Sequence, residues 1–196
     1  MTPQEKISKD KKVYIFIDAG NLWNIYKAKR KMIDFKKLKD YFKGQYSPQE
    51  LNIFYYTSYP KVGTRDGDVS VNHSFFTFLN KGLGFNVVKK PLKQILNNDG
   101  SITEKGNMDV ELAIDLVHNI NNFDIALLLS GDSDFLSLIN YVRNRKKKIY
   151  IYSSRKSVSS ELETGGDGYK DLIDIEEIWG NDLKHKKKAE TKTALN

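Results

Sequence analysis

The sequence predicts an α/β fold, in which a central, mostly parallel sheet is flanked by helices in a three-layer sandwich. Short apolar runs that suit strands alternate along the chain with amphipathic segments that suit helices. Residues 13–17 and 126–129 are apolar at every position, as strands covered on both faces are. At 196 residues the chain is long enough for one such domain with tails.

The first half of the chain alternates strands and helices. We expect a strand over 13–17 and a helix from about Leu22. Asp34 can cap a second helix, which Phe35, Leu38 and Phe42 make amphipathic. We expect that helix to end near Lys43, before Gly44 and Pro48. The elements expected after it are a strand over 51–58, a loop with Pro60, Gly63 and Gly67, a helix near 71–79 and a short strand over 85–89.

The second half continues the alternation. Asn97-Asn98-Asp99-Gly100 predicts a hairpin turn, since Asn, Asp and Gly tolerate the left-handed backbone that tight turns need. The elements expected after the hairpin are a helix over 108–121, a strand over 124–129, a helix over 134–145, a strand over 148–152, a helix over 158–164 and an apolar-acidic segment over 171–179.

Composition narrows the class of protein. The chain has no cysteine, which excludes disulfides and thiolate metal sites. No apolar run approaches the roughly 20 residues that span a membrane, and the N-terminus is polar, so we expect a soluble, cytoplasmic protein without a membrane partner. We expect a flexible tail over 1–11, a domain over 12–180 and a basic tail over 181–196.

The charge distribution admits a polyanionic partner. Of the net charge of +7, residues 1–12 carry +2 and residues 184–196 carry +4, which leaves the core near neutral. Lysine tails are commonly no more than solvated charge. The core nevertheless has three local basic runs, over 27–31, 89–93 and 143–148. Basic runs around an acidic centre would suit a polyanion held over a metal site.

Four aspartates stand where a divalent metal site could be built. Asp18 ends the first apolar strand, and Asp132 and Asp134 follow another. The carboxyl ends of parallel strands are where open α/β sheets bind ligands. Carboxylates gathered there repel one another unless a cation neutralises them, and Mg²⁺ or Mn²⁺ prefer oxygen ligands. One of the polar residues in the turn around Gly131 also caps the next helix.

Asp109 is the fourth acid, at the head of a buried stripe. At 100° per residue, Leu112, Leu116 and Ile120 lie on the same side of the helix as Asp109. Two explanations of an acid at this position stay open: it belongs to the metal site, or it stabilises the first turn through the helix dipole. Glu111, Asp115 and His118 fall on the opposite face. We expect that face to be solvated, with Asp115 outside the metal site.

Four motifs of the sequence resemble motifs of the NYN domain family, and in particular of its LabA-like branch. The motifs are Ile17-Asp18-Ala19-Gly20-Asn21-Leu22, Lys105-Gly106-Asn107-Met108-Asp109 with its continuation to Asp115, Leu129-Ser130-Gly131-Asp132-Ser133-Asp134-Phe135, and Ser160-Glu161-Leu162 with Asp167 and Tyr169. They occur in the family's order between about residues 12 and 178. Ala19-Gly20 and Asn107-Met108 depart from the commoner pairs, and neither departure removes an acid.

The resemblance implies a PIN-like, Rossmannoid fold and metal-dependent ribonuclease chemistry. It also implies that Asp18, Asp109, Asp132 and Asp134 bind Mg²⁺ or Mn²⁺, with Asn21 in support. Ser130 is a further candidate for support in the turn. Such a site hydrolyses RNA to a 5′-phosphate and a 3′-hydroxyl. Lys105 could neutralise a phosphate or be a solvated loop lysine, and the tyrosines at positions 55, 56 and 59 could stack on bases or belong to the core.

Other classes fit less well. The chain has neither G-x-G-x-x-G after a strand nor G-x-x-x-x-G-K-[ST], so the glycine-rich phosphate loops are missing. A haloacid-dehalogenase-type phosphatase needs a second aspartate where Gly20 stands, and a Toprim-type domain needs a glutamate where Asp18 stands. The alternatives left open are a binding or interaction module that keeps the acidic pocket without turnover, and a structural protein whose acids cap helices. The oligomeric state also stays open, although similar folds are commonly homodimers.

Overall fold

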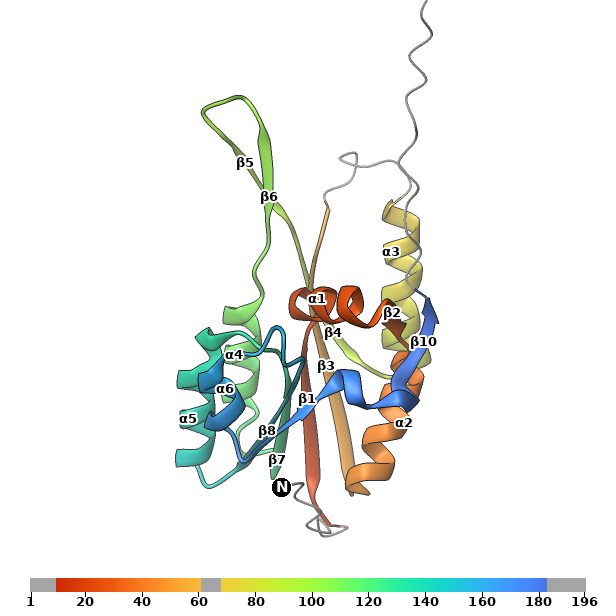
Figure 1. Cartoon of the computed structure of the whole chain (residues 1–196). Helices are drawn as coiled ribbons and strands as arrows, with labels where there is room; N and C mark the ends of the chain where they lie inside the picture. Colours follow the sequence, from red (N-terminus) through yellow and green to blue (C-terminus); the bar gives the residue numbers. More distant parts are fainter. Residues whose placement is uncertain (1–9, 61–67, 183–196) are drawn as a thin grey trace, which may run out of the picture.

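Strand β1 (Lys12–Asp18) lies inside the central sheet of this computed structural model, which describes residues 10–60 and 68–182 (Figure 1). Val13, Ile15 and Ile17 are buried against one layer of helices, and Tyr14 and Phe16 against the other. A continuous apolar run therefore serves both faces, as predicted. The predicted tails, except residues 10–11 and 181–182, and the loop glycines Gly63 and Gly67 lie outside the described residues.

All neighbouring strands of this six-stranded sheet are parallel, in the order β4-β3-β1-β7-β8-β9. The strands besides β1 are β3 (Glu50–Tyr59), β4 (Asn86–Pro91), β7 (Ile125–Leu129), β8 (Lys148–Ser153) and β9 (Gly168–Asp171). The chain builds outward from β1 in one direction through β3 and β4, and then in the other through β7, β8 and β9. The order reverses between β1 and β7, where such sheets open a crevice at the carboxyl ends of the strands.

Helices cover both faces of the sheet, which confirms the predicted α/β sandwich (Figure 1). One face is covered by α1 (Ala19–Lys29), α2 (Phe35–Tyr46), α3 (Asp68–Thr77) and the π-helical turn η1 (Phe78–Gly82). The other face is covered by α4 (Asp109–His118), α5 (Leu136–Asn144) and α6 (Ser160–Gly165). Among the described residues, no helix is both long and apolar enough to cross a membrane.

The short elements complete the fold. They are the antiparallel pair β2 (Lys31–Ile33) and β10 (Trp179–Asp182), the hairpin of β5 (Lys93–Leu96) and β6 (Ile102–Lys105), and the 3-10 turns η2 (Ser133–Phe135), η3 (Leu172–Asp174) and η4 (Glu176–Ile178). The hairpin projects away from the body of the molecule (Figure 1). Its turn stands where the Asn97–Gly100 sequence predicts it.

Two helix boundaries and one strand pairing illustrate where the structure departs from the sequence prediction. Helix α1 begins at Ala19 and not near Leu22, because the Asp18 carboxylate caps it by accepting from the Gly20 and Asn21 amides. Helix α2 continues past Gly44 to Tyr46, whose buried hydroxyl contacts that of Tyr152 at 2.8 Å. The pairing of β2 with β10 was not predicted, because strands of three and four residues are too short for an apolar period to reveal.

Candidate metal centre

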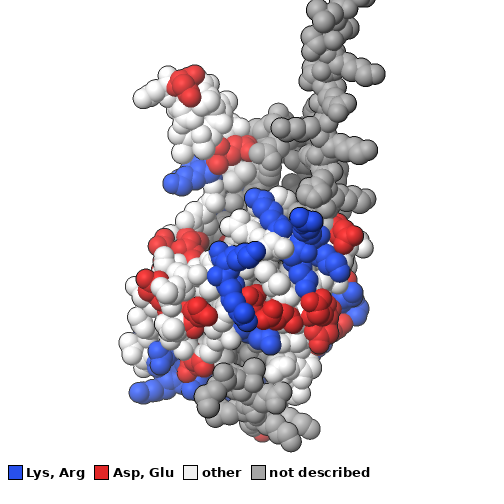
Figure 2. All heavy atoms as spheres, viewed as in Figure 1, with Lys and Arg blue, Asp and Glu red and all other residues white. Residues whose placement is uncertain are grey.

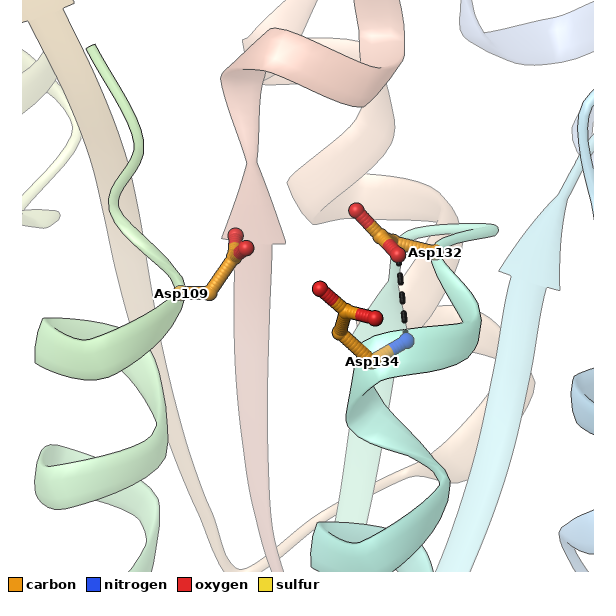
Figure 3. Close-up of side chains that lie close together, drawn as sticks. All are labelled: Asp109, Asp132 and Asp134. Carbon is orange, nitrogen blue, oxygen red and sulfur yellow. Dashed lines mark hydrogen bonds between the residues drawn. The ribbon is translucent and has the colours of Figure 1, made fainter.

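Three aspartates converge at the crevice between β1 and β7. One carboxylate oxygen each from Asp109, Asp132 and Asp134 lie within 4.8 Å of one another. Figure 3 shows Asp109 reaching in from the start of α4, on one side of β1, while the other two come from the turn after β7. The cluster therefore joins segments far apart in sequence at the carboxyl edge of the sheet.

The turn after β7 presents Asp132 and Asp134. The Asp132 carboxylate caps η2 by accepting from the Asp134 amide at 3.0 Å, so one of the predicted turn residues is indeed the helix cap. Gly131 lets this turn lie against the loop after β8: a Cβ added there would stand 2.5 Å from the Ser157 carbonyl oxygen. No side chain can be accommodated at that separation without a shift of the backbone.

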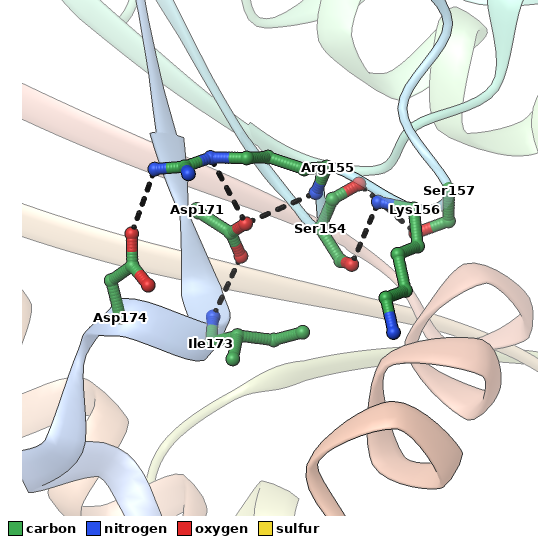
Figure 4. Close-up of polar contacts among 7 residues, drawn as sticks. All are labelled: Ser154, Arg155, Lys156, Ser157, Asp171, Ile173 and Asp174. Carbon is green, nitrogen blue, oxygen red and sulfur yellow. Dashed lines mark hydrogen bonds and ion pairs between the residues drawn. The ribbon is translucent and has the colours of Figure 1, made fainter.

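A polar network holds the loop after β8 against that turn. Asp171, which is buried, accepts from the amides of Arg155 and Ile173, and the Arg155 side chain pairs with Asp171 and Asp174 (Figure 4). The same loop donates the Ser159 amide to the Gly131 carbonyl at 3.1 Å. These contacts fix the backbone on which Asp132 stands.

Asp109 is positioned by the loop between the hairpin and α4. Its amide donates to the Asn107 side chain at 2.7 Å, which orients the first turn of the helix. Gly106 allows close approach to strand β3, since a Cβ there would collide with the Ser58 side chain and with Leu92. Asn107 was not singled out as a site residue from the sequence, although it stands in the motif that carries Asp109.

Asp18 lies beside the cluster and is held by hydrogen bonds. Its Oδ1 accepts from the Gly20 and Asn21 amides at 3.0 and 3.3 Å, and its Oδ2 accepts from the Ser130 hydroxyl at 3.0 Å. Asp18 is not one of the three residues whose carboxylates converge. The sequence-predicted set of four therefore divides into three clustered acids and one neighbour, and Asn21 supports Asp18 through its backbone.

Burial and like charge act together on these acids. Burial raises the pKa of Asp18 above its ordinary value, and the nearby charge of Asp109 adds to the effect, against the hydrogen bonds from Ser130 and Asn21. Burial also raises the pKa of Asp109, and the charges of Asp132 and Asp134 add to it. The site thus disfavours a full set of negative charges unless a cation neutralises it.

A cleft of about 360 Å³ opens onto Asp18 and onto two of the clustered acids, Asp109 and Asp132. It is lined by Asp18, Gly20, Asn21, Asn24, Tyr56, Thr57, Ser58, Lys105, Gly106, Asn107, Met108, Asp109 and Asp132. Lys105 lies on this wall and is exposed, so it can face an anionic substrate. Thr57 and Ser58 are lining residues that the sequence did not indicate, because nothing in their local pattern distinguishes them from the rest of strand β3.

The structure decides between the two alternatives for Tyr55 and Tyr56, and it places one of the basic runs away from the acids. Tyr55 and Tyr56 are buried in the two cores and offer no ring to a base. The basic run over 143–148 lies at the end of α5 and the amino-terminal start of β8, at the end of the parallel sheet opposite the acids. It lines a separate basic pocket with Asn140 and Asp167. A run at that end of the sheet does not border the metal centre.

The basic run over 27–31 belongs to a segment that begins beside the metal centre, at Asp18. It occupies the last turn of α1 and the start of β2, and Figure 2 shows basic side chains gathered on the face that carries α1. Trp23, on the same helix as the cleft-lining Asn21 and Asn24, is 49% exposed and has the Lys27 ammonium 5.4 Å from its ring centroid. An exposed ring beside a cation is an arrangement that stacks on nucleic acid bases.

The polar side of α4 is not the solvated face that the helical phase suggested. Asp115 accepts from the Tyr56 hydroxyl at 3.0 Å, and Glu111 pairs with Lys90 at 2.6 Å. Both acids are half-buried against neighbouring elements. Asp115 nevertheless lies outside the cluster of Asp109, Asp132 and Asp134, as the sequence predicts.

Comparison with known proteins agrees with this architecture. The NYN domain family matches residues 12–173. The low amplitude and bright protein LabA of Synechococcus elongatus is 28% identical over 167 residues, which are 82% of this chain and 83% of that protein. The crystal structure of a protein of unknown function from Vibrio parahaemolyticus superposes with a TM-score of 0.66 at 23% identity, over 91% of this chain and 99% of the other.

The fold and the acid cluster together define a PIN-like, nuclease-type domain with a function related to RNA. The chain belongs to the NYN domain family, whose match covers most of its length.

Proposed function

We propose that this protein is a ribonuclease that hydrolyses RNA phosphodiester bonds with Mg²⁺ or Mn²⁺ held by Asp109, Asp132 and Asp134. The observation that carries the proposal is the convergence of these three carboxylates at the switch point of the sheet. Their donor atoms are all oxygens, which suits a hard divalent cation. Burial is the main cause of the raised pKa of Asp109, and the charges of Asp132 and Asp134 add to it; a cation would relieve both effects.

A divalent cation bound there would supply charge neutralisation and activation of water for attack on phosphorus. In the overall reaction, water forms a new bond from its oxygen to phosphorus and the bond from phosphorus to the 3′ oxygen breaks. The 3′ oxygen takes up a proton, and the products are a 5′-phosphate and a 3′-hydroxyl. We assign to Asp18 a supporting place beside the three acids, fixed by Ser130 and by the amides of α1.

The walls of the cleft suit an RNA strand. Lys105 lies where it can pair with a phosphate next to the reacting one. Trp23 and Lys27 give a stacking ring and a cation on α1, next to Asn24 of the cleft. We propose that the strand leaves the acids along α1, because basic residues continue at the end of that helix.

The test is cleavage of labelled single-stranded and structured RNAs with Mg²⁺, with Mn²⁺ and with chelator. D132N should reduce cleavage at least about a hundredfold, since the amide keeps the cap of η2 but removes one charge of the site. It should also abolish the thermal stabilisation that Mn²⁺ gives the wild-type protein.

D40N is the matched control. Asp40 lies on α2, is exposed and pairs with Lys36 in a surface ion pair, so D40N removes the same charge away from the site. It should cleave and respond to Mn²⁺ as wild type does. Metal-induced stabilisation and RNA binding without cleavage of any RNA would favour a binding module that retains the pocket. D132N that cleaves like wild type would assign the activity to another site.

A further inference from the structure

Large apolar side chains are exposed mostly in one stretch of the chain. Six of the nine found among the described residues lie between positions 95 and 117, with exposed fractions from 39% to 73%. Five of them form two patches. The arm patch consists of Leu96 and Ile102 on one face of the β5–β6 hairpin, and the helix stripe consists of Val110, Ile114 and Val117 on α4. Ile95 lies on the opposite face of the hairpin, because side chains alternate along a strand.

The helix stripe is an ordered apolar face. Its three residues, at spacings of four and three, lie within about 60° of one another around the helix. Glu111 and Asp115 are turned toward Lys90 and Tyr56 instead of toward solvent. Helix α4 thus buries Leu112 and Leu116 in the core, and its exposed side carries an aliphatic stripe where a solvent-facing helix normally carries polar residues.

The hairpin has the same character. Leu96 and Ile102 are directly opposite in the antiparallel pair, so they share one face of the arm. The arm projects beyond the sheet, and in Figure 2 it is mainly uncharged, with an acidic spot at the tip and charged groups at the root. A two-stranded hairpin is at best marginally stable without a surface to pack on.

We propose that the arm patch of one copy packs on the helix stripe of a second copy, and that the second arm does the same in return about a two-fold axis. The two patches fit in length: a four-residue strand and a seven-residue helical step each span on the order of 10 Å. In a two-fold contact, one pairing of arm with helix generates the other.

The area also fits a dimer. With on the order of 180 Å² for a fully exposed Val, Leu or Ile, the five exposed fractions of the two patches amount to roughly 540 Å² on each chain, and two chains together reach about 1,100 Å², above the roughly 1,000 Å² that a specific interface should clear. Each patch alone provides only about half of this, so a single pairing would be weak. Reciprocal pairing of two copies brings both patches of each chain into one interface.

The charges argue against RNA as the occupant. Helix α4 and the turn over 97–101 contain no Lys or Arg, while they contain Asp99, Glu111 and Asp115. A polyanion gains nothing from such a surface. The dimer does not depend on the proposed function, since an inactive protein would form it equally.

Cysteine cross-linking tests the reciprocal contact directly, because the chain has no cysteine of its own. A mixture of L96C and I114C, one of them carrying a size tag, should form a disulfide-linked heterodimer on mild oxidation. Either variant alone should not, because Leu96 of one copy faces Ile114 of the other. D40C in place of I114C is the control and should leave L96C uncoupled, because Asp40 lies on the opposite helical layer.

Light scattering gives the second measurement. The full-length wild-type protein should be a dimer, and I114E and L96E should each raise its dissociation constant at least about tenfold. Circular dichroism checks that both variants remain folded. If I114E does not fold, the dissociation constant of L96E and the mixed cross-link test the contact instead. A wild-type monomer at its highest soluble concentration would overturn the proposal. So would a dimer unaffected by L96E, or the absence of the mixed cross-link.

Discussion

The Ser130 hydroxyl donates a hydrogen bond of 3.0 Å to the Asp18 carboxylate, across the gap between the ends of β7 and β1. The same hydroxyl oxygen accepts from the Asp132 amide at 3.3 Å. One buried hydroxyl thus connects the acid beside the cluster to the turn that carries two of the three clustered acids.

S130A should therefore weaken cleavage more than folding. Loss of the hydroxyl leaves the Asp132 amide and one Asp18 oxygen without this partner, at a cost of about 1–3 kcal/mol in the free energy of unfolding. Misplacement of the acids should lower the cleavage rate about ten- to a hundredfold. S137A, an exposed serine on α5, should change neither denaturant unfolding nor the rate. Wild-type cleavage by S130A would show that the hydroxyl does not position the acids.

G131A and G44A should shift stability in opposite directions. A Cβ at position 131 meets the Ser157 carbonyl at 2.5 Å, so the turn or the loop after β8 must move, at a cost of about 1–3 kcal/mol. A Cβ at position 44 meets nothing within 4 Å and lies in helix α2, where alanine is about 0.5–1 kcal/mol more favourable than glycine. Urea denaturation measures both. Equal stability of G131A and wild type would mean that the turn relaxes freely.

W23A should weaken RNA binding in the presence of chelator. Loss of one stacked base costs about 1–3 kcal/mol, which raises the dissociation constant roughly five- to a hundredfold. F78A is the matched control, because Phe78 is likewise 49% exposed but lies on η1. Fluorescence offers a direct readout, since the only other tryptophan, Trp179, is buried. If RNA binds without quenching the tryptophan emission of the wild-type protein, Trp23 does not contact the RNA.

Truncation of residues 184–196 should separate the tail from the domain. The segment carries five lysines against one glutamate and follows the last apolar positions of the domain. If the tail contacts RNA, binding should weaken for all sequences alike, and its dependence on salt should become shallower. Cleavage at saturating RNA should persist, and the melting temperature should barely change. If the salt dependence of RNA binding is unchanged, these lysines are solvated and do not contact RNA.

Local sequence patterns were sufficient to predict the fold class and the elements that carry the acids. Apolar runs alternating with amphipathic segments are local signals, and they predict β1, β7 and α4 within a few residues. The same local reading placed Asp109 at the head of a buried stripe and Asp132 in a capping turn, and the structure has both. The short pair β2 and β10 gave no such signal.

The tertiary structure alone decided which residues meet. It brought Asp109 to Asp132 and Asp134, held Asp18 beside them, and put the basic run over 143–148 at the far end of the sheet. It also turned Asp115 toward Tyr56 and left Ile114 exposed. Helical phase gives directions around one helix, but the direction that faces the sheet or solvent depends on strand order and packing, which involve residues far apart in sequence.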